Sequence, residues 1–147
     1  AKAGTWVICN HEAKEVAQSD EGTIGYASLV KEFEARLDQV VFAAFLVHGV
    51  DEKESVTSTR PKLIKINWVG PKIKPMMRMK ALSGKAAISR AWQGFALEID
   101  GAAIDDVDEH KDVMDALLGS GGAHKPTDYD FGDAKFPVNF HDNKATD

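Results

Sequence analysis

The strongest constraint on the fold is the stretch VVFAAFLVHGV, from Val40 to Val50, in which His48 is the only polar side chain. A strand with one face in water alternates apolar and polar residues, whereas a strand covered on both faces is apolar throughout. The stretch therefore predicts a central strand with packed layers above and below it. The chain has 147 residues, 44% of them hydrophobic, which is enough for one core of this layered kind.

The segments around this strand predict a mixed order of strands and helices. From Tyr26, apolar residues recur every three or four positions, which indicates an amphipathic helix. The segment from Asp51 to Thr59 is polar and rich in Ser and Thr, so a loop is expected there. The other expected elements are strands over 5–11, 14–19, 62–70 and 95–101, a helix that starts at Pro75 or after Ser83 and runs to about Trp92, and a helix N-capped by Asp105 or Asp106 that stops at 119–122. This order favours an α+β fold: a mixed central β-sheet of about five strands, sandwiched by helices.

Positive charge is concentrated in one segment. Between Arg60 and Arg90 lie nine of the 18 Lys and Arg residues and none of the 23 Asp and Glu residues, although the formal net charge is -5. A solvated surface normally mixes the two signs, because clustered like charges repel. We therefore interpret the segment as a surface for a localised anionic partner, while the acidic remainder argues against a general nucleic-acid binder. Met76, Met77 and Met79 either fill the core or give this surface an apolar centre.

The sequence lacks the common patterns for metal, nucleotide or nucleophilic chemistry. Its five histidines do not show metal-ligand spacing, and neither GxxxxGK[ST] nor GxGxxG is present. Cys9 is the single cysteine, and no activating motif surrounds it in the sequence. The acidic pairs at 105–106 and 108–109 are explained by helix capping, and no apolar run is long enough for membrane insertion. We predict a non-enzymatic protein that needs no metal or cofactor.

Several short motifs form a recognisable pattern. A strand that starts at Lys62 ends in Trp68-Val-Gly70, the Arg-x-Lys pair of Arg78 and Lys80 follows, and Gly-Gly-Ala stands at 121–123. With Trp6-Val7 in the first strand, this pattern resembles the actin-depolymerising factor homology (ADF-H) family, and within it the coactosin and drebrin/Abp1 branch. The resemblance extends from about residue 6 to residue 125. It implies the cofilin-like fold of that family for a domain over residues 1–125, followed by a polar C-terminal tail over 126–147.

The resemblance implies a function in the cytoplasm and the cytoskeleton. It implies binding to the side of actin filaments, without severing, with the helix after Trp-x-Gly as the main contact. The predicted contact residues are Arg60, Lys62, Arg78, Lys80 and Lys85, to which Lys72 and Lys74 are added from the same basic segment. We expect these cations to form one contiguous surface facing an acidic partner. The alternatives are cofilin-like binding of actin monomers with severing of filaments, and binding of phosphoinositides or nucleic acid to the same patch.

Two departures from the family pattern modify these expectations. Family members have a helix ahead of the first strand, but only five residues precede Trp6 here, so we expect a fold without that helix and with some apolar sheet uncovered. Either the polar tail is extended or disordered, or its aromatic residues fold back over the sheet; these are Tyr129, Phe131, Phe136 and Phe140. Leu118-Gly119-Ser120 stands where animal coactosins carry lysines, which puts contacts at that corner in doubt.

Overall fold

The computed structural model of the chain describes residues 1–120 and 125–138. Its elements follow the predicted order, with two additional strands at the end. They are β1 (Trp6–Cys9), β2 (Glu15–Gln18), α1 (Tyr26–Glu34), β3 (Val40–Lys53), β4 (Val56–Val69), α2 (Pro75–Ala91), β5 (Leu97–Gly101), the 3-10 turn η1 (Ile104–Val107), the π-helical turn η2 (Glu109–Met114), α3 (Asp115–Ser120), β6 (Asp128–Asp130) and β7 (Lys135–Pro137). The predicted α+β class is confirmed.

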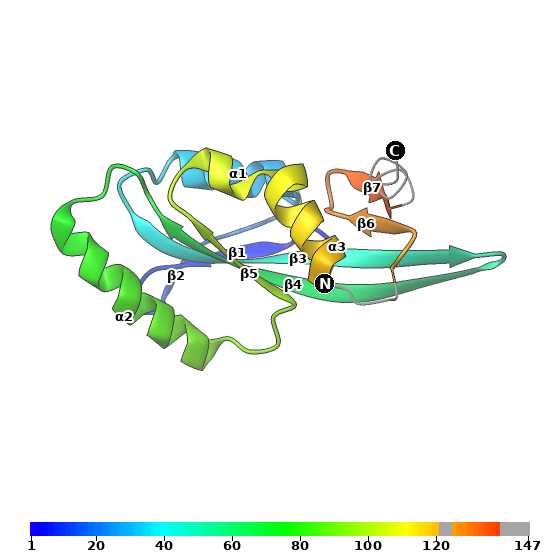
Figure 1. Cartoon of the computed structure of the whole chain (residues 1–147), viewed down its shortest axis with the longest axis horizontal. Coiled ribbons are helices and arrows are strands. Elements are labelled where there is room, and N and C mark those ends of the chain that lie inside the picture. Colours follow the sequence, from blue (N-terminus) through cyan, green and yellow to red (C-terminus); the bar gives the residue numbers. More distant parts are fainter. Residues whose placement is uncertain (121–124, 139–147) are drawn as a thin grey trace.

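The sheet is built around the antiparallel pair β3–β4. The main path runs β2-β1-β3-β4-β5, which matches the expected five strands, and β6 with β7 brings the sheet to seven. β3 and β4 stay in register from Val40↔Val69 to Lys53↔Val56. The expected loop over 51–59 is therefore wrong, because most of these residues form the outer part of this long hairpin (Figure 1). β5 lies parallel to β4, and α2 provides the crossover that a parallel pair requires.

Helices cover both faces of the sheet, as the apolar stretch in β3 predicted. Figure 1 shows α2 on one side and α1 with α3 on the other. Alternate residues of β3 enter two separate clusters: Phe45 belongs to the larger core under α1, and Phe42 packs with Ile88 of α2. The larger core is rich in aromatic contacts, including a stack of Phe33 on Trp68 with ring centroids 4.9 Å apart.

The segment after residue 125 is part of the folded sheet as far as the structure describes it. β6 pairs with β3, and the side chains of Tyr129, Phe131 and Val138 are fully buried. Asp133 accepts hydrogen bonds from the first backbone N–H groups of α1, at 3.3 Å from Tyr26 and 3.1 Å from Ala27. The prediction of an extended or disordered tail is therefore wrong for residues 126–138.

The alternative expectation, that aromatic residues fold back, is correct for part of this segment. Tyr129 and Phe131 pack into the larger core, and Phe136 packs half-buried against it, whereas Phe140 lies outside the described residues. β6 pairs with β3 beyond the end of β1. Tyr129 lies opposite Gly49, on the sheet face of Phe45 and Val47, so its ring points to the α1 side.

On the α2 side, some apolar sheet is uncovered. No helix precedes β1 in residues 1–5, and Leu63 and Val16 remain 37% and 45% exposed. A shallow hollow of about 210 Å³ lies next to Leu63, with walls from Val7, Ala44 and Leu46. This agrees with the expectation that some apolar sheet is uncovered.

Candidate functional site

The candidate site is built on α2, whose two sides have opposite character. Gly84 and Ile88 are buried on its inner side, and Ile88 belongs to the smaller core. On its outer side, Met76, Met79 and Leu82 leave 82%, 79% and 76% of their surface exposed. The spacing of three places these side chains along one side of the helix, over two turns. Met77, by contrast, packs against the smaller core, so the methionines divide between the two predicted roles.

Exposed apolar side chains of this size are unusual elsewhere on the molecule. Among the described residues, six large hydrophobic side chains are exposed, and three of these six belong to α2. Arg78 and Lys80 are exposed and alternate with them along the helix. We call Met76, Arg78, Met79, Lys80 and Leu82 the outer face of α2. A contiguous apolar ridge with a charged rim has the composition of a protein interaction surface.

The charges at the start of α2 oppose its local stability. Lys74 is the N-cap, Pro75 follows in the first turn, and that turn has no acidic residue. A helix N-terminus carries partial positive charge and favours anions, by roughly 0.3–1 kcal/mol for each side chain. Lys74 and the neighbouring exposed Lys72 therefore gain nothing from this position in the folded chain. An acidic partner would remove the repulsion, which agrees with a binding role for this end of the helix.

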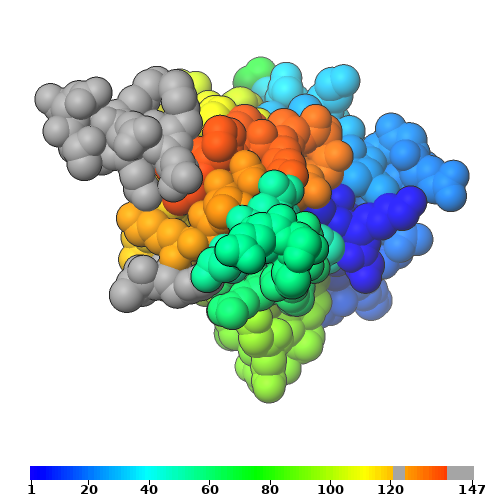
Figure 2. All heavy atoms as spheres, turned by 90° about the vertical axis from the view of Figure 1, so that its right-hand side faces the viewer, coloured from blue at the N-terminus to red at the C-terminus, as the bar shows by residue number. Residues whose placement is uncertain are grey.

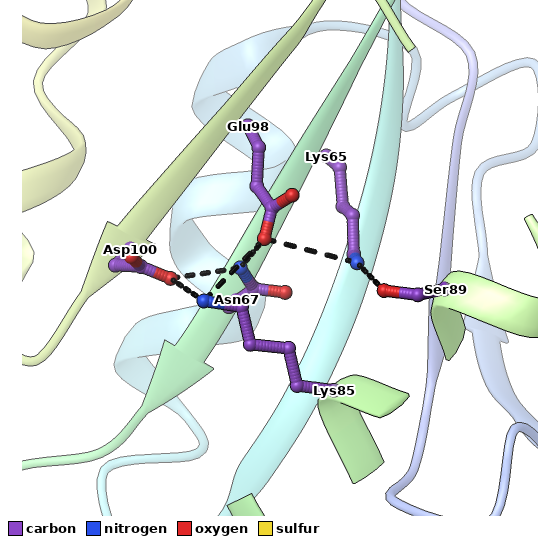
Figure 3. A network of polar contacts seen from close by, with 6 residues as sticks. All are labelled: Lys65, Asn67, Lys85, Ser89, Glu98 and Asp100. Carbon is purple, nitrogen blue, oxygen red and sulfur yellow. Dashed lines mark hydrogen bonds and ion pairs between the residues drawn. The ribbon is translucent and has the colours of Figure 1, made fainter. Parts of the chain in front are cut away.

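Lys85 lies on the inner edge of α2, away from the outer face. Its Nζ lies 3.4 Å from Asp100 Oδ1 and 3.6 Å from Glu98 Oε2, both on β5 (Figure 3). The two carboxylates of the chain itself thus neutralise this predicted contact residue. The prediction that Lys85 adds to one outward-facing cationic surface does not agree with this placement.

Sequence reasoning missed the polar network that holds Lys85. Lys65 is buried, and its Nζ lies 3.2 Å from Ser89 Oγ of α2 and 3.8 Å from Glu98 Oε2. Asn67 donates through Nδ2 to Glu98 Oε2 at 2.6 Å and to Asp100 Oδ1 at 2.8 Å. The sequence contains a signal for this network. Parallel pairing of KIN (65–67) with EID (98–100) places Lys65 beside Glu98 and Asn67 beside Asp100. The network links Lys85 and Ser89 of α2 to the sheet. These contacts fix the orientation of the helix, and with it the direction in which the outer face of α2 points.

Arg60 and Lys62 lie on the β3–β4 hairpin, far from the outer face of α2. Ser89 of α2 contacts Lys65, and from this point Arg78 lies eleven residues back along the helix and Arg60 five residues back along β4. These two paths lead in opposite directions from the contact. At the usual rise per residue of a helix and a strand, Arg78 and Arg60 are therefore on the order of 30 Å apart. By strand alternation, Arg60 and Lys62 share the sheet face of Ile64, opposite α2.

The hairpin also carries acidic residues. On the same sheet face, Asp51 lies diagonally across from Arg60. Glu52, the next residue of β3, points to the other face and forms an ion pair with Lys135 at 3.3 Å. Figure 2 shows the hairpin end projecting toward the viewer, with β6 and β7 above it and the end of α2 below. The cations predicted as one surface therefore separate into two groups: Lys72, Lys74, Arg78 and Lys80 at the start of α2, and Arg60 with Lys62 on a mixed-charge hairpin.

In residues 1–120 and 125–138, no group of three or more His, Cys, Asp or Glu side chains is placed to hold a metal ion. Burial, followed by the charge of Glu15, raises the pKa of the Cys9 thiol, which keeps it protonated and unreactive. None of the described helices is long and apolar enough to cross a membrane.

Comparison with known proteins places this geometry in a family. Residues 1–117 match the family of cofilin/tropomyosin-type actin-binding proteins. The fold is similar to human coactosin-like protein (19% identity, TM-score 0.59, 78% of this chain and 82% of that one) and to the cofilin homology domain of the yeast actin-binding protein ABP1P (17%, 0.53, 74% and 75%). It is also similar to mouse coactosin, an actin filament binding protein (23%, 0.52, 80% and 78%). No curated protein matches the sequence significantly.

Because the family match covers most of the chain, the chain belongs to the cofilin/tropomyosin-type actin-binding proteins, whose shared fold is the ADF-H domain. It is a non-enzymatic, actin-binding domain whose structural neighbours are coactosins and the Abp1 cofilin homology domain. The resemblance inferred from the Trp-x-Gly and Arg-x-Lys motifs is therefore confirmed at the level of the family and the fold.

Proposed function

We propose that this chain binds the side of actin filaments through the outer face of α2 and does not sever them. The observation that carries the proposal is the exposed ridge of Met76, Met79 and Leu82 beside Arg78 and Lys80. Burial of a large apolar side chain contributes about 1.5–3 kcal/mol, whereas an exposed ion pair contributes about 0–1 kcal/mol. The ridge therefore supplies most of the affinity, and the cations supply orientation and a faster encounter with an acidic surface.

Lys72 and Lys74 extend this contact beyond the start of the helix. Both are exposed, and no acidic residue of α2 neutralises them. Their positive charge near the helix N-terminus is unfavourable in the free protein and becomes favourable when an acidic surface docks there. We assign Lys85 a different role, which is to hold α2 on the sheet through Glu98 and Asp100.

The hairpin provides a second contact that favours a filament over a monomer. Arg60 and Lys62 lie on the order of 30 Å from Arg78 by the rise per residue of helix and strand. A polymer repeats its surface along its length and can meet both groups of cations at once. The mixed charge of the hairpin makes this contact the weaker one, so we expect Arg60→Ala with Lys62→Ala to reduce filament affinity by about threefold.

Co-sedimentation with actin filaments tests the proposal. The full chain should pellet with filaments at low salt and less completely at moderate salt, because exposed charges are screened over a Debye length of about 8–10 Å. Equal pelleting at both salt concentrations would contradict the role of the cations, and no pelleting at either would contradict filament binding.

Two further assays separate the alternatives left open by the sequence. Filament length measured by microscopy should be unchanged at saturating protein; shortened filaments, together with tight binding to actin monomers, would favour cofilin-like severing. Flotation with vesicles that contain a phosphoinositide should leave the protein unbound at physiological salt; recovery with the vesicles would assign the same basic residues to lipid. Filament binding would place the protein in the cytoplasm, on the actin cytoskeleton.

A further inference from the structure

We propose that Met76 and Met79 form a modification site for hydroperoxides, and that oxidation of their sulfur atoms releases the chain from actin filaments. Their reactivity follows from the geometry of α2 alone, whereas the release rests on the proposed function of its outer face. The two thioether side chains are 82% and 79% exposed, which leaves their sulfur atoms open to a small oxidant in solution. Figure 1 shows α2 at the edge of the molecule, with the sheet on its inner side.

The other sulfur atoms of the chain are shielded. Of the four methionines, Met114 is 1% exposed in the larger core, and Met77 packs half-buried against the smaller core. Cys9 is the single cysteine and is 5% exposed, and burial raises the pKa of its thiol, so little of the reactive thiolate forms. Oxidation of sulfur depends on exposure. Met76 and Met79 should therefore react before the thiol and before the shielded methionines.

The reaction transfers one oxygen atom from a hydroperoxide to a thioether. The sulfur lone pair attacks an oxygen of the peroxide, so that a sulfur–oxygen bond forms while the oxygen–oxygen bond breaks. The sulfur loses two electrons and the peroxide is reduced. With hydrogen peroxide, the departing hydroxide takes the proton of the new S–OH group and leaves as water. The product, methionine sulfoxide, is polar and chiral, and a separate reductase for each epimer restores the thioether.

Sulfoxides at these positions change the character of the outer face of α2. Met76 and Met79 supply two of the three apolar side chains of its ridge, and Leu82 supplies the third. A sulfoxide oxygen is a strong hydrogen-bond acceptor that loses bound water when a partner covers it, which removes the benefit of burying the side chain. Lys80 lies four residues after Met76 on the helix, so its ammonium group can donate to the new oxygen and is then withdrawn from an acidic partner.

Peroxide treatment of the full chain, followed by fragmentation mass spectrometry of its peptides, tests the modification site. Sulfoxide should form on Met76 and Met79 at least about fivefold faster than on Met77 and Met114, because reactivity depends on exposure. The chain that carries both sulfoxides should unfold at the same temperature as the untreated chain, since both side chains lie in solvent. Equal rates at all four methionines, or a lower unfolding temperature, would overturn the site.

Co-sedimentation tests the release from filaments. Catalase removes the peroxide before actin is added, so that only this chain is oxidised. The oxidised chain should bind at least about tenfold more weakly, and both methionine sulfoxide reductases together should restore binding. Unchanged binding, or a loss that the reductases do not reverse, would overturn the release. If the untreated chain does not pellet, filament binding and its release fail together, whereas the mass spectra still decide the modification site.

Paired variants test whether the ridge is responsible. Met77→Leu with Met114→Leu replaces the shielded methionines by a side chain of similar volume, and its filament binding should still fall at least about tenfold on oxidation. Met76→Leu with Met79→Leu removes the proposed site. Its binding after peroxide treatment should stay within about twofold of its own untreated sample. Equal responses of the two variants would overturn the assignment.

Discussion

At the scale of single residues, Glu109 departs from the ordinary chemistry of a surface carboxyl group. Burial raises the pKa of its carboxyl to about 7, and the neighbouring charges of Asp133 and Asp108 add to the shift. Its Oε1 is buried without a hydrogen-bond partner among the described residues. The folded state therefore favours the protonated form, and ionisation of this group opposes folding.

Glu109→Gln should stabilise the protein at alkaline pH and have little effect in acid. The folded pKa of about 7 lies above the ordinary value of 4.5, so the cost of ionisation is absent below about pH 4.5, grows toward pH 7 and is complete above it. Allowing for solvent screening of a half-buried group, we expect a gain of about 1 kcal/mol at pH 8. Thermal unfolding at pH 8 and pH 5 measures it, with the exposed Glu34→Gln as control. A gain that is equal at both pH values would contradict this explanation.

Sequence reasoning recognised the kind of residue that caps the last helical segment but not the residue itself. Asp105 and Asp106 were predicted, yet the cap is Asp108, which accepts from the N–H groups of His110 and Lys111 at 3.1 and 2.9 Å. Four of the five residues from 105 to 109 are acidic, and each could cap a helix that starts in the right place. The intervening 3-10 turn decides the start, and its position depends on the burial of Val107 in the core.

At the scale of elements, the close approach of α2 to the sheet depends on Gly84. A glycine inside a helix costs roughly 1 kcal/mol relative to alanine, so its presence needs a reason. A Cβ at this position would lie 2.8 Å from Phe42 Cε2, 2.8 Å from His11 Cβ and 2.9 Å from His11 Cα. The helix can lie this close to β3 and to the β1–β2 turn only because no side chain intervenes.

Gly84→Ala should therefore destabilise the protein, although alanine is the better helix former. We expect the free energy of unfolding to fall by about 1–3 kcal/mol, because overpacking a tight core is destabilising. Helix propensity alone would predict that it rises by about 1 kcal/mol. Denaturant unfolding measures the change. Ser83→Ala, at an exposed neighbour in the same helix, should be neutral or slightly stabilising. A stabilised Gly84→Ala variant would show that α2 sits further from the sheet.

The elements that sequence reasoning placed correctly are those with one strongly buried side. β3 was recognised from its continuous apolar residues, and α1 from the spacing of Tyr26, Leu29 and Phe33, all of which are buried. The outer hairpin was missed because residues 51–60 are exposed or half-exposed on both faces, so no alternation marks them as strands. Val56, Thr57 and Thr59 favour strands by propensity, and this weaker signal was the only one available.

At the scale of the whole molecule, residues 126–138 complete the larger core from the far end of the sequence. Their own pattern is polar and short, and its meaning depends on contacts with β3 and α1 at least 75 residues away in the chain. Local sequence cannot report such contacts. For the same reason, the separation of Arg60 and Lys62 from α2 could not be predicted, because it follows from the length of the β3–β4 pair.

Removal of residues 126–147 should prevent stable folding. The described part of this segment buries Tyr129, Phe131 and Val138 and supplies Asp133 to the start of α1. At about 1.5–3 kcal/mol for each large apolar side chain, the loss approaches the 5–15 kcal/mol that stabilises a typical domain. Circular dichroism during thermal unfolding should show no cooperative transition. A truncated chain that unfolds at the same temperature as the full chain would contradict the placement of β6.

A milder pair of variants tests the same packing in a chain that still folds. Phe131→Ala should cost about 3–5 kcal/mol, because the ring is fully buried between Tyr26, Phe45 and Phe136. Phe136→Ala should cost clearly less, since this ring is half-buried. Equal losses would mean that the two rings do not differ in burial as described.

The most direct test of the account is filament co-sedimentation of the double variant Arg78→Ala with Lys80→Ala at low salt. The control is Lys14→Ala with Lys31→Ala, which removes the same charge from exposed positions outside α2. If the outer face of α2 docks on the filament, the first variant should bind at least about tenfold more weakly and the control within about twofold of the unaltered chain. Equal binding of the two variants would show that net charge, rather than this face, governs the interaction.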